Sequence, residues 1–268
     1  MVRYRRLVSL VLPLHLLLAC AGPSGDGGTP EEESVTASAA SLPPILATNA
    51  FYYYADLDVA WEFYSRVLGF QTVADYGFAK MLQVSPTSFL TLVDEARGMH
   101  DSSEPKSATL AIVTEEVEEW WDYLNGLGVE MRATLGTVEP GQPHDGFVAI
   151  DPEGYLLEFE RFNPHAENTE LIPVLREIEA LYPTPGQEPA TGIETLRPEN
   201  LGIQATVLWL YYRDLGRIQS FYQAVFHRDI IVDQGWAKVF QTCLLYTSPS
   251  PRDNQPHLVC RLLLEIVG

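Results

Sequence analysis

The chain has 268 residues, of which 17 are basic and 36 are acidic, for a formal net charge of −19. Such an acidic protein is repelled by nucleic acids and anionic lipid surfaces, so nucleic-acid binding is not expected. There are only three cysteines, Cys20, Cys243 and Cys260, and all three fall in segments that we predict to lie outside the fold. The composition therefore indicates no disulfide framework, zinc–thiolate site or cysteine nucleophile.

Residues 1–20 have the features of a signal peptide. Basic residues open the segment, and an apolar run from Leu7 to Leu18 follows, which is too short to span a bilayer comfortably. The run ends in Leu-Ala-Cys at Cys20, which resembles a bacterial lipobox and implies cleavage before Cys20 and lipidation of its sulfur. An ordinary secretory signal with a chance cysteine is the alternative.

Residues 21–44 are rich in Gly, Ser, Pro and Glu, which predicts a flexible tether. Ala21 follows the cysteine, and by resemblance to Gram-negative lipoproteins this points to the outer membrane. We therefore expect a protein of the cell envelope, anchored by lipid on the periplasmic face, with the membrane as its partner through that anchor.

The next segment predicts the order strand, helix, strand, strand, strand. Leu46–Tyr54 alternates loosely and is rich in aromatic residues, as strands are. Asp56 is a good N-cap for a helix from Leu57 to about Leu68, which Gly69 ends. The three strands that follow are predicted at Gln71–Asp75, Ala79–Val84 and Phe89–Val93.

The same order recurs in the following residues. Ala108–Val113 reads as an apolar strand and Glu115–Leu127 as a helix with an acidic start. The last three strands are predicted at Glu130–Val138, Gly146–Ile150 and Tyr155–Phe162, with a tight turn at Asp151–Gly154. Residues 164–200 are then expected to hold a bracing helix, Glu167–Tyr182, and a turn-rich linker, Pro183–Gly192.

A long repeat follows. The 38 residues from Ala47 align without a gap with the 38 residues from Ala205, at an offset of 158 residues and with 14 identities. One fold unit used more than once is the simplest cause. Residues 201–242 are therefore predicted to begin a second domain, with residues 45–163 as the first.

Residues 243–268 look foreign. CLLYTSPSPRD, from Cys243, and HLVCRLLLE, His257–Glu265, can be reverse-translated into two successive parts of a transposase adapter used in sequencing libraries. The alternative is a natural Pro/Ser loop followed by an apolar helix. We expect this tail to lie outside the fold and the second domain to be truncated, with an unpaired sheet edge.

Two segments, in this order along the chain, resemble the vicinal oxygen chelate family: ADLDVAWEFYSRVLGF and DPEGYLLEFERF. That family includes glyoxalase I, bleomycin-resistance proteins and extradiol dioxygenases. The resemblance implies an α+β fold in which paired βαβββ units form a curled mixed sheet around an internal cavity. It also implies tandem copies here, the second one truncated.

Enzymes of that family hold a divalent metal in the cavity. Their ligand positions fall on Asn49, Thr91, Glu158 and near Ala108 in the first domain, and on Val207 in the second. Only Glu158 is a competent ligand among these, so no metal site is predicted. A site for Fe, Mn, Zn or Ni is the alternative.

Strand alternation places Asn49, Phe51 and Tyr53 on one face of the first strand, and Met81 and Gln83 on one face of a later strand. Together with Glu158 they are the predicted ligand-binding residues, since a mostly apolar cavity with a few polar groups is typical of small-molecule sites. A filled aromatic core is the alternative.

Glu158 is also the one candidate catalytic residue, as a base in the cavity. The alternative is a structural carboxylate paired with Arg161 or Lys80.

These features predict an envelope lipoprotein that binds a small molecule without a catalytic metal. A metal-dependent lyase, isomerase or ring-cleaving dioxygenase is the first alternative. A structural or interaction module with filled cavities is the second alternative. Both a monomer and a dimer are compatible with these features.

Overall fold

The computed structural model describes residues 45–136, 140–183, 193–227 and 229–242, and the backbone of residues 262–267. The predicted signal peptide, the lipidation site Cys20 and the tether lie outside the described residues. In the described part, no helix combines the length and the apolar character that crossing a membrane requires. All of this part belongs to one compact body within Pro43–Gly268.

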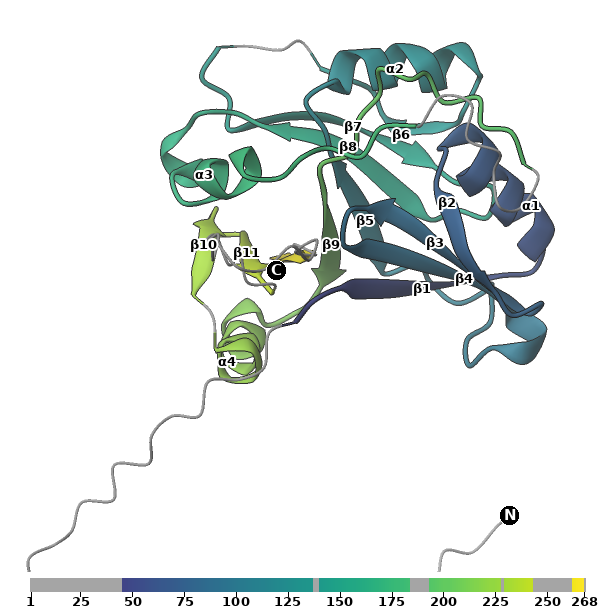
Figure 1. Ribbon diagram of the computed structural model, residues 1–268. Coiled ribbons are helices and arrows are strands. Elements are labelled where there is room, and N and C mark those ends of the chain that lie inside the picture. Colours follow the sequence, from purple (N-terminus) through teal and green to yellow (C-terminus); the bar gives the residue numbers. More distant parts are fainter. Residues whose placement is uncertain (1–44, 137–139, 184–192, 228, 243–261, 268) are drawn as a thin grey trace, which may run out of the picture. The chain divides into compact units, whose positions relative to one another are not determined.

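The first βαβββ unit confirms its predicted elements. Asp56 caps the first helix by accepting a hydrogen bond from the backbone N–H of Val59, and Gly69, with φ of 68°, follows the helix end. The unit consists of β1 (Thr48–Tyr54), α1 (Leu57–Glu62) with its π-helical continuation (Phe63–Val67), β2 (Gln71–Asp75), β3 (Ala79–Ser85) and β4 (Ser88–Asp94) (Figure 1).

The second unit has the same order, and the third begins in the same way. The second unit consists of β5 (Ala108–Val113), α2 (Val117–Gly126), β6 (Met131–Ala133), β7 (His144–Ile150) and β8 (Leu156–Phe162). The third consists of β9 (Ala205–Tyr211), α4 (Leu215–Phe226), β10 (Ile230–Asp233), β11 (Ala237–Gln241) and β12 (Leu262–Val267).

Two predictions need correction here. The helix expected at Glu167–Tyr182 is reduced to a short 3-10 turn, Ala166–Asn168, and α3, Leu171–Arg176. Pro173 explains the late start, because it lacks an N–H and tolerates only the first turn of a helix. The strand predicted at Gly146–Ile150 begins two residues earlier, since His144 is the first residue of β7.

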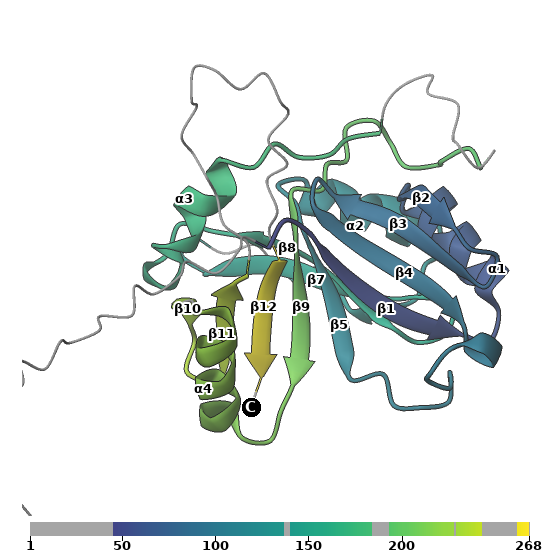
Figure 2. The same ribbon diagram turned by 60° about the horizontal axis from the view of Figure 1, so that its bottom comes forward.

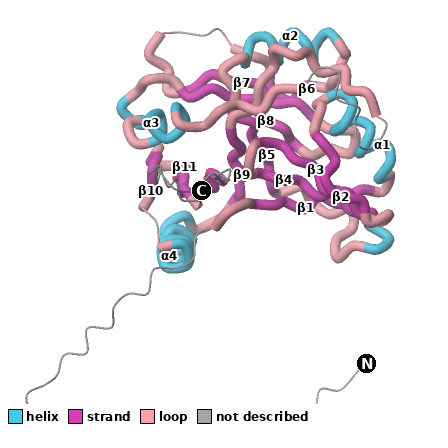
Figure 3. Tube along the Cα trace, viewed as in Figure 1, coloured by secondary structure: helices cyan, strands magenta, loops and turns pink. Residues whose placement is uncertain are grey.

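The strands form two mixed sheets, drawn in magenta in Figure 3. The first unit alone makes a four-stranded sheet in the order β1-β4-β3-β2, and the other two units share an eight-stranded sheet in the order β10-β11-β12-β9-β5-β8-β7-β6. The mixed, curled α+β fold is as predicted. The pairing of the units differs from the prediction, because β5 pairs edge to edge with β9 of the third unit and not with β1.

The expected unpaired edge in the third unit is also wrong. β12 pairs in parallel with β9 and antiparallel with β11, so it lies between them (Figure 2). Residues 262–267 of the tail thus complete a four-stranded arrangement like that of the first unit. The resemblance of the encoding sequence to an adapter is not tested by this pairing.

The first two units pack through their other faces. Tyr52, Leu82 and Leu90 of the four-stranded sheet share one buried cluster with Ile112 and Phe159 of the eight-stranded sheet and with both helices α1 and α2. Burial of these large apolar side chains holds the two sheets together, since each contributes roughly 1.5–3 kcal/mol on leaving water.

A buried carboxylate lies at this junction. One oxygen of Asp151 accepts hydrogen bonds from the hydroxyls of Tyr54, at 2.7 Å, and Tyr64, at 3.0 Å. The other oxygen accepts from the backbone N–H groups of Glu153 and Tyr155, at 3.0 and 2.7 Å. The turn of the second unit is therefore fastened to the strand and the helix of the first.

The third unit allows the contribution of the Asp151 hydrogen bonds to be tested. Tyr54 and Tyr64 recur as Tyr212 and Tyr222, whose hydroxyls lie 2.8 Å apart, and within the described part of the chain no carboxylate is hydrogen-bonded to this second pair. We expect Tyr54→Phe to lower the free energy of unfolding by about 1–2 kcal/mol, because Asp151 is left under-bonded in the core, and Tyr212→Phe to lower it by about 0.5 kcal/mol or less.

Urea unfolding of the compact body, compared with both variants, measures the two changes. Equal losses in the two variants would show that the carboxylate adds nothing to the tyrosine pair.

Candidate functional site

Five of the six predicted ligand-binding residues come together on one side of the four-stranded sheet. The register pairs Asn49 with Phe89 and Phe51 with Thr91 across β1 and β4, and it pairs Met81 with Thr91 across β3 and β4. Side chains paired in this way point to the same side. We call this side the open face; its members are Asn49, Phe51, Tyr53, Met81, Gln83, Phe89 and Thr91.

The open face is apolar with a few polar groups. Phe51 is 55% exposed, and Met81 and Phe89 are partly exposed. The Thr91 hydroxyl donates to the Asn49 side-chain oxygen at 2.9 Å, and the Gln83 amide donates to the Pro86 carbonyl at 3.3 Å. The polar side chains thus keep part of their hydrogen-bonding capacity for a ligand.

A loop after β4 borders the open face at Tyr53. The ring of His100 packs edge-on against the Tyr53 ring, with 4.9 Å between centroids. A Cβ atom at Gly98 would lie 2.5 Å from the Tyr53 ring, so only glycine allows this approach. Met99 in the same loop is 86% exposed.

Glu158 does not join this face. It lies on β8 opposite Ala111 of β5, on the side of the eight-stranded sheet that also carries Phe162. There the cluster around it includes Leu171 and Leu175 of α3, which pack against the apolar strands. The prediction that Glu158 lines the same cavity as the other five residues is therefore wrong, because β5 pairs with β9 and not with β1.

The environment of Glu158 is nevertheless unusual. Burial raises the pKa of its carboxyl to about 7, because loss of water disfavours the charged form. A carboxyl that exchanges its proton near neutral pH is suited to acid–base chemistry. Leu171 and Leu175 of α3, however, belong to the buried cluster on its face of the sheet.

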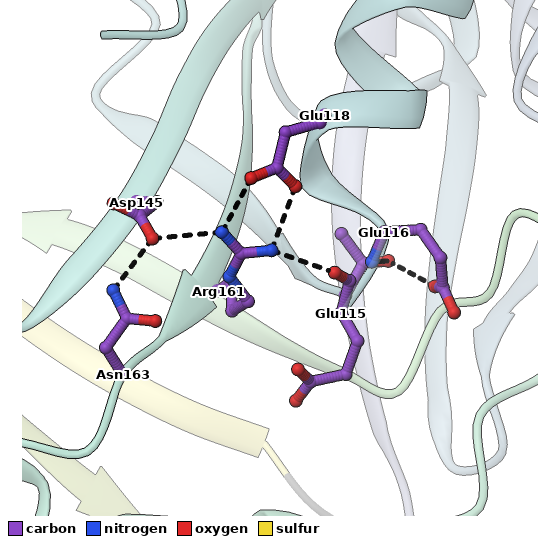
Figure 4. Close-up of polar contacts among 7 residues, drawn as sticks. Glu115, Glu116, Glu118, Asp145, Arg161 and Asn163 are labelled. Carbon is purple, nitrogen blue, oxygen red and sulfur yellow. Dashed lines mark hydrogen bonds and ion pairs between the residues drawn. The ribbon is translucent and has the colours of Figure 1, made fainter. Parts of the chain in front are cut away.

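Neither expected pairing partner of Glu158 is available. Arg161 points to the other side of β8, where its guanidinium binds both oxygens of Glu118, at 2.8 and 2.9 Å, and one oxygen of Asp145, at 3.1 Å (Figure 4). These two carboxylates raise the pKa of the guanidinium further. The alternative of a Glu158–Arg161 pair is thus wrong.

Lys80 is likewise engaged elsewhere. Its ammonium lies 2.8 Å from Asp75 and 4.2 Å from the centroid of the Trp61 ring. Asp75 also accepts a hydrogen bond from the backbone N–H of Gly77, whose φ is 78°. The third unit repeats the arrangement with Asp233, Gly235 and Lys238. These repeated residues therefore fix a hairpin and are not part of a site.

Sequence reasoning missed one concave surface. A groove of about 600 Å³ lies beside α1 and is lined by Asp58, Trp61, Glu62, Arg66, Ile193, Glu194 and Leu196. No signal in the sequence joins α1 to residues 193–196, which are far apart along the chain. Across the described residues, no group of three or more His, Cys, Asp and Glu side chains is arranged to hold a metal ion.

Comparison with known proteins supports the fold. Residues 46–159 match the family model described as the Glyoxalase/Bleomycin resistance protein/Dioxygenase superfamily. No curated protein sequence matches the chain.

Several solved structures resemble it. A glyoxalase I mutant from Zea mays is 16% identical over 84% of this chain and 68% of its own, with a TM-score of 0.48. TioX from Micromonospora sp. ML1 is 18% identical over 44% of this chain and 98% of its own, with a TM-score of 0.38. Lactoylglutathione lyase from Agrobacterium tumefaciens is 21% identical over 44% and 95%, with a TM-score of 0.37.

The family assignment rests on the model match. The domain at residues 46–159 belongs to the Glyoxalase/Bleomycin resistance protein/Dioxygenase superfamily.

The raised pKa of Glu158 predicts a pH dependence of stability. A carboxyl whose pKa is higher in the folded state stabilises the fold most at low pH, and this contribution is lost as pH rises from about 4.5 through about 7. We therefore expect Glu158→Gln to raise the free energy of unfolding relative to wild type, by about 1–3 kcal/mol more at pH 8 than at pH 4.5.

Urea unfolding at several pH values measures this difference. Glu118→Gln is the control of opposite sign, because hydrogen bonds from Arg161 lower the pKa of Glu118. Its stabilising effect is present at neutral pH and is lost on acidification. A pH-independent effect of Glu158→Gln would contradict the raised pKa.

Proposed function

We propose that this protein binds a small, mostly apolar molecule on the open face of its four-stranded sheet, without a catalytic metal. The observation that carries the proposal is the arrangement of Phe51, Tyr53 and Met81 beside Asn49 and Gln83 on one exposed side of the sheet. Exposed apolar side chains with a few fixed polar groups are typical of recognition sites for such ligands.

The polar groups define the chemistry of the ligand. Asn49 and Gln83 offer neutral amides, and the Asn49 oxygen already accepts from Thr91. A neutral ligand with a hydrogen-bonding group fits these amides better than an anion, which the net charge of −19 repels.

The proposal includes the place of the protein in the cell. The apolar run that ends at Cys20 supports a lipid anchor, and residues 21–44 would separate that anchor from the folded body. We propose an outer-membrane lipoprotein whose folded part lies in the periplasm.

Glu158 supports a second candidate function. A carboxyl with a pKa of about 7, at a family ligand position, fits a metal-dependent lyase, isomerase or dioxygenase. Elemental analysis of the purified body distinguishes the two functions. A stoichiometric divalent ion, lost in Glu158→Ala, would favour the enzyme and overturn the metal-free proposal.

A third candidate is a structural module. The apolar cluster of α3 with β5 and β9 supports it for the eight-stranded sheet, where Leu171 and Leu175 share one buried cluster with Ala111 and Val207. The exposure of Phe51 favours binding on the four-stranded sheet instead.

We test the binding proposal with Nile red, a neutral apolar fluorescent probe. Met81→Lys is expected to weaken its binding by about tenfold or more, since a buried methionine contact is worth roughly 1.5–3 kcal/mol. Met99→Lys is the matched control, because Met99 is 86% exposed in a loop and is expected to change the affinity little. Equal effects of the two variants, or no saturable binding, would contradict the proposal.

A further inference from the structure

The groove beside α1 lies apart from the open face and is formed by two segments that are distant along the chain. One wall is the outer side of α1 with its π-helical continuation, and the other is the segment of residues 193–196 (Figure 1). Its volume of about 600 Å³ suits a small organic molecule and is far larger than a single ion requires.

Hydrogen bonds join the two walls. In an α-helix the carbonyl of Arg66 would accept from the N–H of Phe70, but here that N–H donates to the carbonyl of Tyr64, at 2.9 Å. The Arg66 carbonyl instead accepts from the N–H of Leu196, at 2.7 Å. The π-helical end of the helix thus provides the acceptor that holds the second wall.

The second wall is also fixed from behind. Arg197 is 5% exposed, and its guanidinium donates to the carbonyls of Leu201, at 2.6 Å, and Leu181, at 2.7 Å. A Cβ atom at Gly69 would lie 2.8 Å from the hydroxyl oxygen of Thr195, so the helix end approaches this segment closely. A wall that is already ordered loses little conformational entropy when a ligand binds.

The aromatic side chain of the groove is held in place as well. The indole N–H of Trp61 donates to the hydroxyl of Thr72, at 2.9 Å. The buried ammonium of Lys80 lies 4.2 Å from the centroid of the Trp61 ring. A second cation over the same ring would be repelled by the first, so Trp61 offers a ligand an apolar surface more than a cation site.

The charge of the groove is negative. Its single base, Arg66, lies 3.1 Å from Glu62. Asp58 and Glu194 form no ion pair with any other residue that the structure describes. These two carboxylates, in a chain with a net charge of −19, attract cations to the groove and repel anions from it.

The fold of the unit does not require the groove residues. At the offset of the repeat, the capping Asp56 recurs as Asp214 and the tyrosine Tyr64 as Tyr222. The groove positions of α1 do not recur, since their counterparts in α4 are Gly216, Gln219, Ser220 and Ala224. The acidic and aromatic side chains of the groove are therefore particular to the first unit.

We propose that this groove binds a small organic cation, an amine with an apolar body. The ammonium group of the ligand would bind the carboxylates of Asp58 and Glu194. Its apolar part would pack against Trp61, Ile193 and Leu196, of which Leu196 is 46% exposed. A metal ion fits less well, because no group of three or more acidic or histidine side chains gathers here or elsewhere in the described residues.

Other occupants available from this chain lack the complementary charge. Residues 21–44 contain Asp26 and three successive glutamates, Glu31 to Glu33, and no lysine or arginine. A second copy of the chain carries the same net charge of −19 and is repelled. The proposed occupant is therefore a separate, cationic molecule.

Titration with dansylcadaverine, a fluorescent primary amine with an apolar ring system, tests the proposal. We expect saturable binding at one site, weakened about tenfold when Asp58→Asn and Glu194→Gln are combined. The matched control combines Glu119→Gln with Asp122→Asn, which removes the same charge from exposed positions of α2 and should change the affinity by less than about twofold. Equal effects of the two double variants would show non-specific attraction and overturn the proposal.

Dansylamide, which has the same ring system and no ammonium group, tests the need for a cation. We expect it to bind wild type about tenfold more weakly than dansylcadaverine and to be insensitive to the Asp58→Asn and Glu194→Gln pair. Equal affinity of the two dyes would contradict a cation site. Displacement of dansylcadaverine by tetralysine but not by phenethylamine would indicate a basic peptide as occupant and also overturn the proposal.

The groove and the open face can be tested separately. The Asp58→Asn and Glu194→Gln pair should leave the affinity for Nile red unchanged, because neither residue belongs to the open face. Loss of Nile red binding in this variant would show that the two dyes share one site and would overturn a separate amine site. Dansylcadaverine binding to wild type that does not bind Nile red would support the groove and contradict the proposed function of the open face.

Discussion

The architecture depends on one property of the βαβββ unit, which is that its single helix does not cover the apolar side of its sheet without a second unit. The first two units solve this on the helix side, where Asp151 binds Tyr54 and Tyr64 above a common apolar core. Burial raises the pKa of the Asp151 carboxyl in spite of its four hydrogen bonds, so the carboxylate is costly to bury. The Asp151 carboxylate positions the two units, since it fixes where the turn of one unit meets the strand of the other.

The strand edge imposes the second constraint, and it decides where a site can form. Because β5 pairs with β9, the face that carries Glu158 curls toward the third unit and is packed with α3. The four-stranded sheet keeps its face exposed instead. The same repeat position therefore holds a buried Trp209 in one place and an exposed Phe51 in the other. The difference between them comes from the neighbours and not from the residues.

Local structure was largely predictable from the sequence. Asp56, Gly69 and Gly77 mark a cap, a helix end and a turn, and the alternation in β1 and β3 correctly put Asn49 and Met81 on one side of a sheet. These signals are short-range and belong to the residues concerned. The choice of partner for β5 was not predictable, because β1 and β9 each open an equivalent βαβββ unit and no local signal indicates which of the two edges pairs with β5. The misplacement of Glu158 follows from that choice.

The repeat allows residues at equivalent positions of two units to be compared. Recurrence of a residue in two units does not by itself indicate function, since Asp75 with Lys80 and Asp233 with Lys238 make the same hairpin contacts. Function is better sought where equivalent positions differ in environment. By that criterion the open face around Phe51 and the partly exposed pair of Tyr212 and Tyr222 stand apart from their covered counterparts. A ligand that binds on the open face would bury Phe51, as the pairing of β9 with β5 accompanies the burial of Trp209 at the same repeat position.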